Sequence, residues 1–363
     1  MPAYLGKVAR LGREILLVDG RAGPGIFDDG SYGSPIIMCE AAERYARDKY
    51  VALFVNNSQS HHERLERNLA ERGWLDHAIP ILGDSTAFLT TLSLHLRDQT
   101  VFVYLDPFGL RGCEFETLRP FLTRPMSYST EIVLNVSMPV THRLAATNAV
   151  AEGRISNPRI TRYHELLSEV FGGDYWKDIY WSDLTAEQKE LALIAEYQRR
   201  ISKYLPYTGS CPVRESRSSR VRYFITFASR HPDAMLLMND TMCSAYYGQM
   251  HQKDYEGTLF AETDWRSPQS ASELDAIILQ KAKANPGLTR KDLWLTIVQE
   301  HFMRFTAKEY RNCIKGLMAN RKLEPTRDPL TGRLNDTCKI YLPDGVQSKR
   351  DSARKSDSSS RRS

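Results

Sequence analysis

Residues 14–25 read E-I-L-L-V-D-G-R-A-G-P-G, an apolar run that stops at Asp19 and breaks into glycine and proline. The run is too short for a helix and has the composition of a buried strand in a parallel sheet. The glycines behind it allow a tight turn and a close approach of a bound nucleoside to the backbone, which a Cβ atom would block. The stretch therefore predicts a ligand site at the carboxyl end of this strand.

The glycine turn differs from two common nucleotide-binding motifs. It does not follow G-x-G-x-x-G, and it lacks the Lys-Ser/Thr pair of a P-loop. Asp-x-x-Ala-Gly-x-Gly resembles instead the turn that S-adenosylmethionine-dependent methyltransferases place after their first strand. The resemblance implies S-adenosylmethionine as cofactor. The candidate cofactor-binding residues of this turn are Asp19, Gly20, Ala22, Gly23, Pro24 and Gly25.

Strand and helix signals alternate through the first half of the chain. Further strands are predicted over residues 50–56, 78–82, 100–105 and 131–136. One helix is expected to begin near Ser34, and another at a capping box of Ser60 and Glu63. Repeated β-α-β units at this spacing predict a doubly wound α/β sheet, the Rossmann-like methyltransferase fold, with ligands at the carboxyl ends of the strands.

Two more cofactor contacts are expected at strand ends. Asn56 ends the second strand, where methyltransferases usually carry an acid that binds the ribose hydroxyls. An asparagine lacks the charge-assisted hydrogen bonds of a carboxylate. Asp84 follows the third strand, where such enzymes recognise the adenine amino group.

The fourth strand runs into L-D-P-F-G, which supplies the candidate catalytic residues Asp106, Pro107, Phe108 and Gly109. Methylation of an exocyclic amine needs an acceptor that orients the NH₂ group and an aromatic face that holds the base outside its stack. The motif resembles Asp/Asn-Pro-Pro-Tyr/Phe of amino-methyltransferases, and more closely the Asp-Pro-Phe/Tyr-Gly of tRNA guanine-N2 dimethyltransferases. The alternative is structural: Asp106 caps a helix and the next three residues form a turn.

Composition limits the other classes of function. The chain has 363 residues, 42% of them hydrophobic and 26% charged, with room for one large domain and one small one. The N-terminus lacks the apolar core of a signal peptide, and no run approaches the roughly 20 apolar residues of a membrane span. The six cysteines lie singly and the nine histidines show no metal-ligand spacing. We expect a cytoplasmic protein without a metal site or a membrane partner.

The large domain is expected to cover residues 1–267, with a helical insertion over 141–220 above the active edge of the sheet. A basic loop ends this insertion, and its Arg214, Arg217 and Arg220 are candidates for contact with a substrate backbone or are simply solvated. A serine-rich, basic tail over 346–363 is predicted to be disordered.

Residues 268–345 read as three helices followed by a hairpin, the order of a winged helix-turn-helix domain. This segment holds 13 Lys and Arg against 9 Asp and Glu. Its third helix, over 306–320, is the predicted recognition helix for DNA or RNA. The outward-facing residues expected to contact nucleic acid are Lys308, Arg311, Asn312 and Lys315. The alternative is a protein-docking module of the same fold.

Four stretches together resemble the three-Cys-motif partner (TcmP) family. They are D-G-R-A-G-P-G, F-D-D-G-S-Y-G-S-P, L-D-P-F-G and R-Y-F-I-T-F-A-S-R-H-P. The resemblance covers most of residues 1–345 and implies a methyltransferase-like domain, a C-terminal winged helix and a partner, the radical-S-adenosylmethionine-like three-Cys-motif protein. Arg21 and Asn56 depart from the family, which usually has Phe and an acid at these positions.

The residues and the resemblance lead to one main prediction: S-adenosylmethionine-dependent methyl transfer to a nucleobase amine in DNA or RNA. Two alternatives remain open. One is a non-catalytic subunit that positions the three-Cys-motif protein, and the other is a DNA-binding regulator whose large domain senses a ligand. Arg21 and Asn56 favour the alternatives, whereas the intact L-D-P-F-G motif favours catalysis.

Overall fold

The computed structural model describes residues 2–107, 109–145, 157–215, 219–255, 268–328 and 331–343. Phe108, Arg217 and the tail 346–363 lie outside these ranges. The chain divides into two compact units, Met1–Met238 and Asn239–Ser363. The division falls earlier than the expected boundary after residue 267, because the helix α10 (Pro232–Tyr255) belongs partly to each unit.

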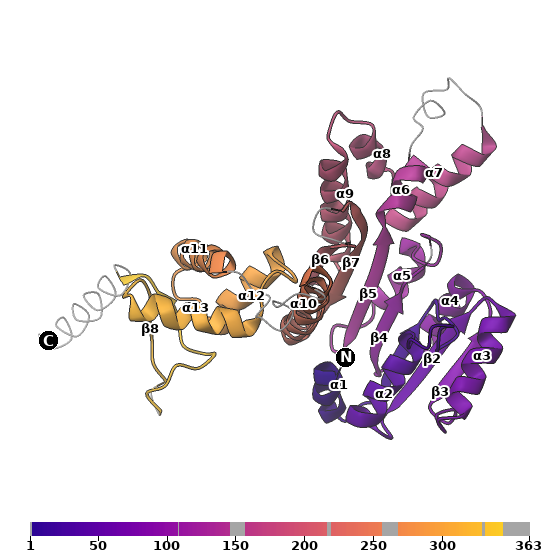
Figure 1. The fold of residues 1–363 in the computed structure, drawn as a ribbon, viewed down its shortest axis with the longest axis horizontal. Coiled ribbons are helices and arrows are strands. Elements are labelled where there is room, and N and C mark those ends of the chain that lie inside the picture. The colour runs from indigo at the N-terminus through magenta and orange to yellow at the C-terminus, as the bar shows by residue number, and fades with distance from the viewer. Residues whose placement is uncertain are drawn as a thin grey trace, which may run out of the picture. The chain divides into compact units, whose positions relative to one another are not determined.

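The first unit is built on a seven-stranded sheet (Figure 1). Its strands are β1 (Ile15–Asp19), β2 (Tyr50–Asn56), β3 (Ala78–Leu82), β4 (Thr100–Leu105), β5 (Thr130–Ser137), β6 (Tyr207–Arg214) and β7 (Val221–Ser229). They lie in the order β3-β2-β1-β4-β5-β7-β6, and the five strands from β1 to β5 are parallel. Only β7 runs antiparallel to its neighbours β5 and β6. The predicted Rossmann-like α/β class is confirmed, and every residue of β1 is buried.

Helices connect the strands and cover the sheet. The helices of this unit before α10 are α1 (Pro2–Val8), η1 (Ala9–Leu11, a 3₁₀ turn), α2 (Ser34–Ala46), α3 (Gln59–Ala70), α4 (Ser85–His95), α5 (Phe115–Leu122), α6 (Met138–Ala145), α7 (Pro158–Phe171), α8 (Tyr175–Tyr180) and α9 (Ala186–Ile201). The predicted start at Ser34 is confirmed. The predicted capping box is wrong: Ser58 is the N-cap of α3 and accepts a hydrogen bond from the His61 N–H at 3.4 Å, because the helix begins already at Gln59.

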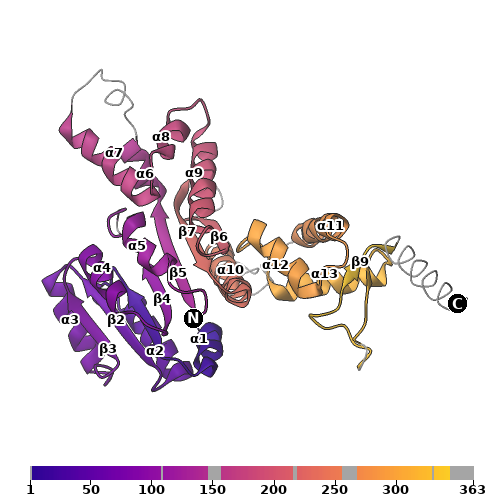
Figure 2. The ribbon, with the colours of Figure 1, turned by 180° about the vertical axis from the view of Figure 1, so that it is seen from behind.

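The insertion after β5 packs on the sheet through a shared core. β5 leads directly into α6, and α7 lies beside α6 (Figure 2). Val103 and Leu134 of the sheet belong to one buried cluster with Phe171, Trp176 and Tyr197 of the insertion helices. Burial of aromatic side chains of this size contributes strongly to stability, so the insertion is an integral part of the first unit.

The expected insertion over 141–220 is only partly helical. The polar loop predicted over 211–220 is wrong in its first part, because residues 207–214 form β6, which pairs with β7 in the register Cys211↔Ile225. β6 lies at the edge of the sheet and contains Pro212. An edge strand tolerates proline because one side of it needs no N–H donor for pairing. The helical part of the insertion therefore ends with α9.

Beyond α10, the described part of the second unit holds three helices and a short two-stranded antiparallel sheet in the expected order. They are α11 (Pro268–Ala284), α12 (Arg290–Glu300), α13 (Ala307–Ala319), β8 (Glu324–Pro325) and β9 (Ile340–Tyr341). Trp294 of α12 stacks on Tyr310 of α13, with ring centroids 4.8 Å apart. The buried amide of Asn239 donates to the Phe305 carbonyl at 2.8 Å and accepts from the Met303 N–H at 2.7 Å. These bonds attach the second half of α10 to this unit. Within the described ranges, no helix is long and apolar enough to cross a bilayer.

Candidate functional site

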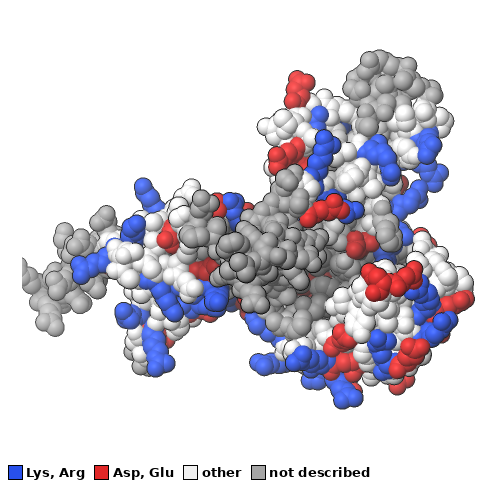
Figure 3. Space-filling model, viewed as in Figure 1, with Lys and Arg blue, Asp and Glu red and all other residues white. Residues whose placement is uncertain are grey.

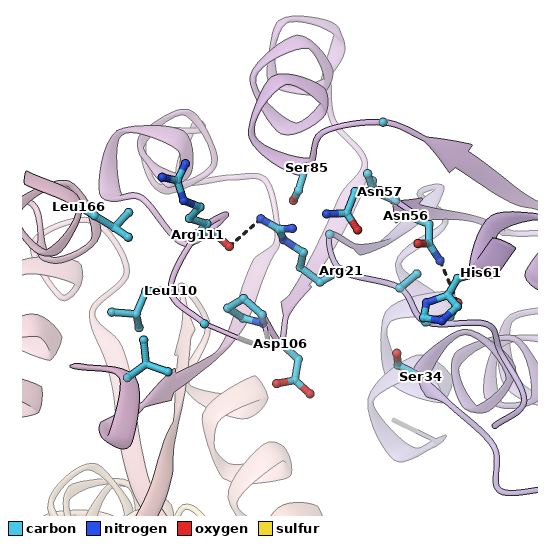
Figure 4. Close-up of a pocket in the computed structure, with 18 of the residues that line it drawn as sticks. Arg21, Ser34, Asn56, Asn57, His61, Ser85, Asp106, Leu110, Arg111 and Leu166 are labelled. Carbon is cyan, nitrogen blue, oxygen red and sulfur yellow. Dashed lines mark hydrogen bonds between the residues drawn. The ribbon is translucent and has the colours of Figure 1, made fainter. Parts of the chain in front are cut away.

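A cavity of about 520 Å³ opens at the carboxyl ends of β1, β2 and β4 (Figure 4). Its size is that of a typical small-molecule site. The sequence-predicted residues that line it are Gly20, Ala22, Gly23, Pro24, Asn56, Asp106, Pro107 and Gly109. Three predicted residues, Asp19, Gly25 and Asp84, do not line it. Two predicted groups of residues, the glycine turn and the Asp-Pro motif, thus meet at one cavity although they are far apart in sequence.

Asp19 lies fully buried beneath the glycine turn. One carboxylate oxygen accepts from the Ser34 hydroxyl at 2.5 Å, and the other accepts from the Arg21 N–H at 3.0 Å. Burial raises the pKa of Asp19 to about 6, although both hydrogen bonds act in the opposite direction, and the nearby Asp106 adds a smaller upward effect. Asp19 therefore holds the turn through its hydrogen bonds, and its ionised form lowers the stability of the fold.

The glycine turn is held between two strands. The Gly20 N–H donates to the Tyr104 carbonyl of β4 at 3.0 Å, and the Ala22 N–H donates to the Val55 carbonyl of β2 at 2.9 Å. A Cβ atom on Gly20 would lie 2.3 Å from Leu105 Cδ2. The packing of the turn on β4 thus favours glycine at position 20, because the Leu105 side chain would have to move to admit a Cβ atom, and the turn lines the cavity.

The end of β2 places two asparagines at the cavity. Asn56 is only 3% exposed, and its amide is already engaged: Nδ2 donates to the Gly23 carbonyl at 3.2 Å, and Oδ1 accepts from the Ser58 N–H at 3.1 Å. Asn57 is exposed and also lines the cavity (Figure 4). Asn56 thus holds the glycine turn against β2, and Asn57, which the sequence reasoning missed, presents a second amide at the position expected for ribose recognition.

The third strand end places Ser85, not Asp84, at the cavity. Asp84 is exposed and caps α4, accepting from the Ala87 N–H at 2.9 Å, and it lines a neighbouring hollow. Ser85 is 1% exposed, and its hydroxyl has no hydrogen-bond partner within the described residues. A buried hydroxyl without a partner is costly, so this hydroxyl is a candidate contact for a polar ligand.

Asp106 is exposed to the cavity and fixed by an aromatic neighbour. The Tyr104 hydroxyl donates to one oxygen of the Asp106 carboxylate at 3.0 Å. Burial, with a contribution from the Asp106 charge, raises the pKa of the Tyr104 hydroxyl well above its usual range, so the tyrosine is a hydrogen-bond donor at neutral pH. The helix-cap alternative for Asp106 finds no support, because α5 begins only at Phe115.

Arg21 connects the two loops that frame the cavity. Its guanidinium donates to the Arg111 carbonyl at 2.8 Å (Figure 4). The backbone at Gly112 has φ +93°, and a Cβ atom there would lie 2.8 Å from Arg21 Nε. The arginine at position 21 is thus accommodated by a glycine in the facing loop, and it places a positive charge at the cavity.

The insertion helices form one wall of the cavity. The residues that α6 and α7 contribute are Val140, Arg143, Leu144, Arg162, Tyr163 and Leu166. The arginines predicted to contact a substrate backbone lie elsewhere in the insertion. Arg214 and Arg220 line a separate hollow, where Arg214 pairs with Glu187 at 3.2 Å. They lie away from the candidate cavity because Arg214 ends β6 and Arg220 directly precedes β7, the two strands at the far edge of the sheet.

In the second unit, α13 exposes one polar face. Lys308, Arg311, Asn312 and Lys315 are all exposed, whereas Ile314 and Leu317 are buried. The helix begins at a capping box in which Thr306 accepts from the Glu309 N–H and Glu309 accepts from the Thr306 N–H. The predicted orientation of this helix is therefore confirmed, and its partner stays a prediction.

Comparison with known proteins yields distant structural matches only. No protein-family model and no curated protein matches the sequence. An O-methyltransferase from Bacillus cereus in complex with S-adenosylhomocysteine is 14% identical over 63% of this chain and 81% of its own, with a TM-score of 0.30. The O-methyltransferase TomG from Streptomyces achromogenes, in complex with S-adenosylmethionine, is 15% identical over 62% and 77%, with a TM-score of 0.31. Spermidine synthase from Thermotoga maritima is 11% identical over 64% and 58%, also with a TM-score of 0.31.

Proposed function

We propose that this protein transfers a methyl group from S-adenosylmethionine to an exocyclic amine of a nucleobase in DNA or RNA. One observation carries the proposal: Asp106 and Pro107, at the end of β4, line the same cavity as the glycine turn after β1. A cofactor held by the turn and an amine held by Asp106 would then occupy one cavity, which is what proximity catalysis requires.

The cavity residues fit S-adenosylmethionine, which would supply an electrophilic methyl group. The glycine turn lines the cavity, Ser85 offers a buried hydroxyl without a partner in the described chain, and Asn57 offers an exposed amide. These three features would hold the methionine moiety and the adenosine. Arg21 is the feature that fits least, since its guanidinium carries the same charge sign as the cofactor's sulfonium.

The role of Asp106 follows from its surroundings. Tyr104 holds one carboxylate oxygen, which leaves the other able to accept a hydrogen bond from a substrate NH₂ group. Such a bond orients the amine so that its lone pair faces the methyl donor, and it stabilises the positive charge that develops on nitrogen. Pro107 follows with a carbonyl oxygen as a second acceptor. Phe108, the expected stacking residue, lies outside the described residues.

The test is a methyl-incorporation assay with a matched binding measurement. Tritiated methyl transfer into total DNA and total RNA is measured for the wild type and Asp106→Ala, with and without the three-Cys-motif protein. S-adenosylhomocysteine affinity is measured by calorimetry for both. We expect incorporation by the wild type alone and similar affinities, because Asp106 faces the substrate. Incorporation that Asp106→Ala leaves untouched would refute the role of this residue.

We propose that the second unit is a winged helix-turn-helix domain that binds nucleic acid through α13. The exposed polar face of α13 and the order of three helices and a hairpin support this. Replacing Lys308, Arg311 and Lys315 by alanine should weaken duplex binding and flatten its salt dependence. If affinity and slope both stay unchanged, the unit is better explained as a protein-docking module.

A second candidate function is a non-catalytic subunit of the three-Cys-motif protein. Two observations favour it: the Asn56 amide is engaged by Gly23, and Arg21 brings a fixed positive charge to the cavity. The resemblance to the TcmP family supports the same partner, and the scattered cysteines support a cytoplasmic location. This candidate predicts binding to the three-Cys-motif protein and no methyl transfer to either polymer.

A further inference from the structure

The candidate cavity is surrounded by an excess of positive charge. Four of its lining residues are arginines, Arg21, Arg111, Arg143 and Arg162, whereas Asp106 is the only acidic residue among the described residues that line it. Arg21 is held by the Arg111 carbonyl. The other three guanidiniums belong to exposed residues and make no hydrogen bond or ion pair within the described part of the chain. We call Arg111, Arg143 and Arg162 the arginine rim.

The rim differs from the charged surface elsewhere in this unit. Exposed arginines outside the cavity often have carboxylate partners, such as Arg119 with Glu116 at 2.6 Å and Arg199 with Glu196 at 2.6 Å. The acidic residues of α7 form no ion pair with the rim among the described residues. Glu165 is exposed, and Glu169 lines the neighbouring hollow, which Arg111 also lines together with Asp84, Glu114 and Glu116. Figure 3 shows basic side chains over α7. Arg143 and Arg162 thus keep their charge available for a ligand, whereas Arg111 lies between the candidate cavity and the acidic neighbouring hollow.

Of the proposed reactants, only the phosphates of a nucleic acid would be attracted by the positive charge of the rim. S-adenosylmethionine carries a sulfonium and gains nothing from more positive charge. A free nucleobase or nucleoside is neutral at the atoms that would meet these arginines. A phosphodiester is an anion that guanidinium groups bind through paired hydrogen bonds. The three arginines are also spread widely enough to contact successive phosphates of one nucleic-acid strand. Arg111 follows β4 on one side of the cavity, and Arg143 and Arg162 lie on the insertion helices.

On the basis of the methyl-transfer function above, we propose that Arg111, Arg143 and Arg162 bind the phosphates next to the target nucleotide, so that the substrate is a nucleic-acid strand and not a free base, nucleoside or small amine. The insertion helices are then the part of the first unit that recognises the strand. Tyr163, which lines the cavity beside Arg162 and accepts from Arg159 at 2.5 Å, offers an aromatic face to a neighbouring base.

The experiment measures strand binding by the full-length chain. Fluorescence anisotropy follows labelled single strands of DNA and of RNA, of about 16 nucleotides, the upper site size of common single-strand binders. The variants are Arg143→Ala/Arg162→Ala and the charge-retaining Arg143→Lys/Arg162→Lys. The control is Arg10→Ala. Arg10 is exposed and precedes β1, so it lies toward the amino ends of the parallel strands, away from the cavity at their carboxyl ends.

We expect the alanine pair to weaken strand binding about tenfold or more. The slope of log affinity against log salt should fall by about 1.4, because each phosphate contact with a single strand contributes about 0.7. The lysine pair should keep most of the slope, and Arg10→Ala should behave as wild type. All three residues are exposed, so thermal unfolding should be unchanged. Equal loss with Arg10→Ala, an unchanged slope with the alanine pair, or no strand binding by the wild type would overturn the proposal.

Two further measurements separate this proposal from the methyl-transfer function. If the alanine pair loses strand binding but the wild type transfers no methyl group, the rim binds nucleic acid and the chemistry is wrong. If the wild type methylates a nucleoside as well as a strand, and the alanine pair retains both activities, the chemistry holds and the rim has no role. A preference for the DNA or the RNA strand identifies the natural polymer.

Discussion

Replacing Asp19 by asparagine removes a fully buried carboxylate beside the candidate cavity while keeping the shape of the side chain. The new amide oxygen can still accept from the Arg21 N–H, and the new NH₂ group can donate to the Ser34 hydroxyl, which donates to Asp19 in the wild type. The variant therefore resembles the protonated wild type, and the comparison isolates the cost of the charge.

The size of the effect follows from the raised pKa. The pKa of Asp19 rises from 3.8 to about 6, and a difference of about 2 units corresponds to about 3 kcal/mol. Because the folded state binds the proton more tightly than the unfolded state, the stabilising contribution is complete below pH 3.8 and is lost as pH rises through about 6. Above that pH, Asp19→Asn should be more stable than the wild type by up to about 3 kcal/mol.

Urea unfolding of both proteins, followed by tryptophan fluorescence between pH 5 and pH 8 (roughly one unit below and two above the raised pKa), measures the difference. The stability gap should widen as pH rises and level off once Asp19 is ionised. Asp76→Asn changes an exposed carboxylate of the same unit and should show no such gap. A gap between wild type and Asp19→Asn that is the same at both ends of the pH range would refute the reasoning.

Two predictions concern the glycine turn. Gly20→Ala should lower the free energy of unfolding by about 1–3 kcal/mol, the usual cost of overpacking, because its Cβ would meet Leu105 at 2.3 Å. The control is Gly83→Ala, whose Cβ would have nothing within 4 Å, and it should change the melting temperature little. From the sequence alone, Asn56→Glu should tighten cofactor binding by about 1 kcal/mol. The structure reverses this expectation, since a carboxylate cannot donate to the Gly23 carbonyl, and calorimetry with S-adenosylhomocysteine should show weaker binding; tighter binding would contradict the role given to Asn56.

The sequence predicts the sheet well where strands are buried on both faces. β1 and β2 are apolar runs closed by a polar residue, and burial on both faces makes such runs continuous. β6 escapes this reasoning because its burial is mixed and it contains Pro212, so its composition is that of a loop. An edge strand of this composition is identified only by its hydrogen bonds to the neighbouring strand. The pairing of β6 with β7 is a tertiary contact, which the local sequence pattern does not contain.

The candidate site also has a part that the sequence predicts and a part that depends on tertiary packing. The meeting of Gly20 and Asp106 is predictable, since parallel strands end at one edge of the sheet. The choice between Asp84 and Ser85 depends on how α4 begins, which places adjacent side chains at different hollows. The contributions of Arg143 and Arg162 depend on how the insertion packs on the sheet, and no local motif signals that packing.

The charges around the cavity come from two different parts of the fold, and this division bears on both proposals. The carboxylates of Asp19 and Asp106 lie at or just beyond the ends of β1 and β4, and the charge of Asp106 makes the buried charge of Asp19 more costly. A cationic cofactor at this edge would reduce that cost, which gives a physical reason for a fold to retain a buried, destabilising carboxylate. The arginine rim comes instead from the loop after β4 and from the insertion, where an anionic strand would approach. Carboxylates at the ends of the β-strands would attract a cationic methyl donor, and arginines around them would attract a polyanionic methyl acceptor.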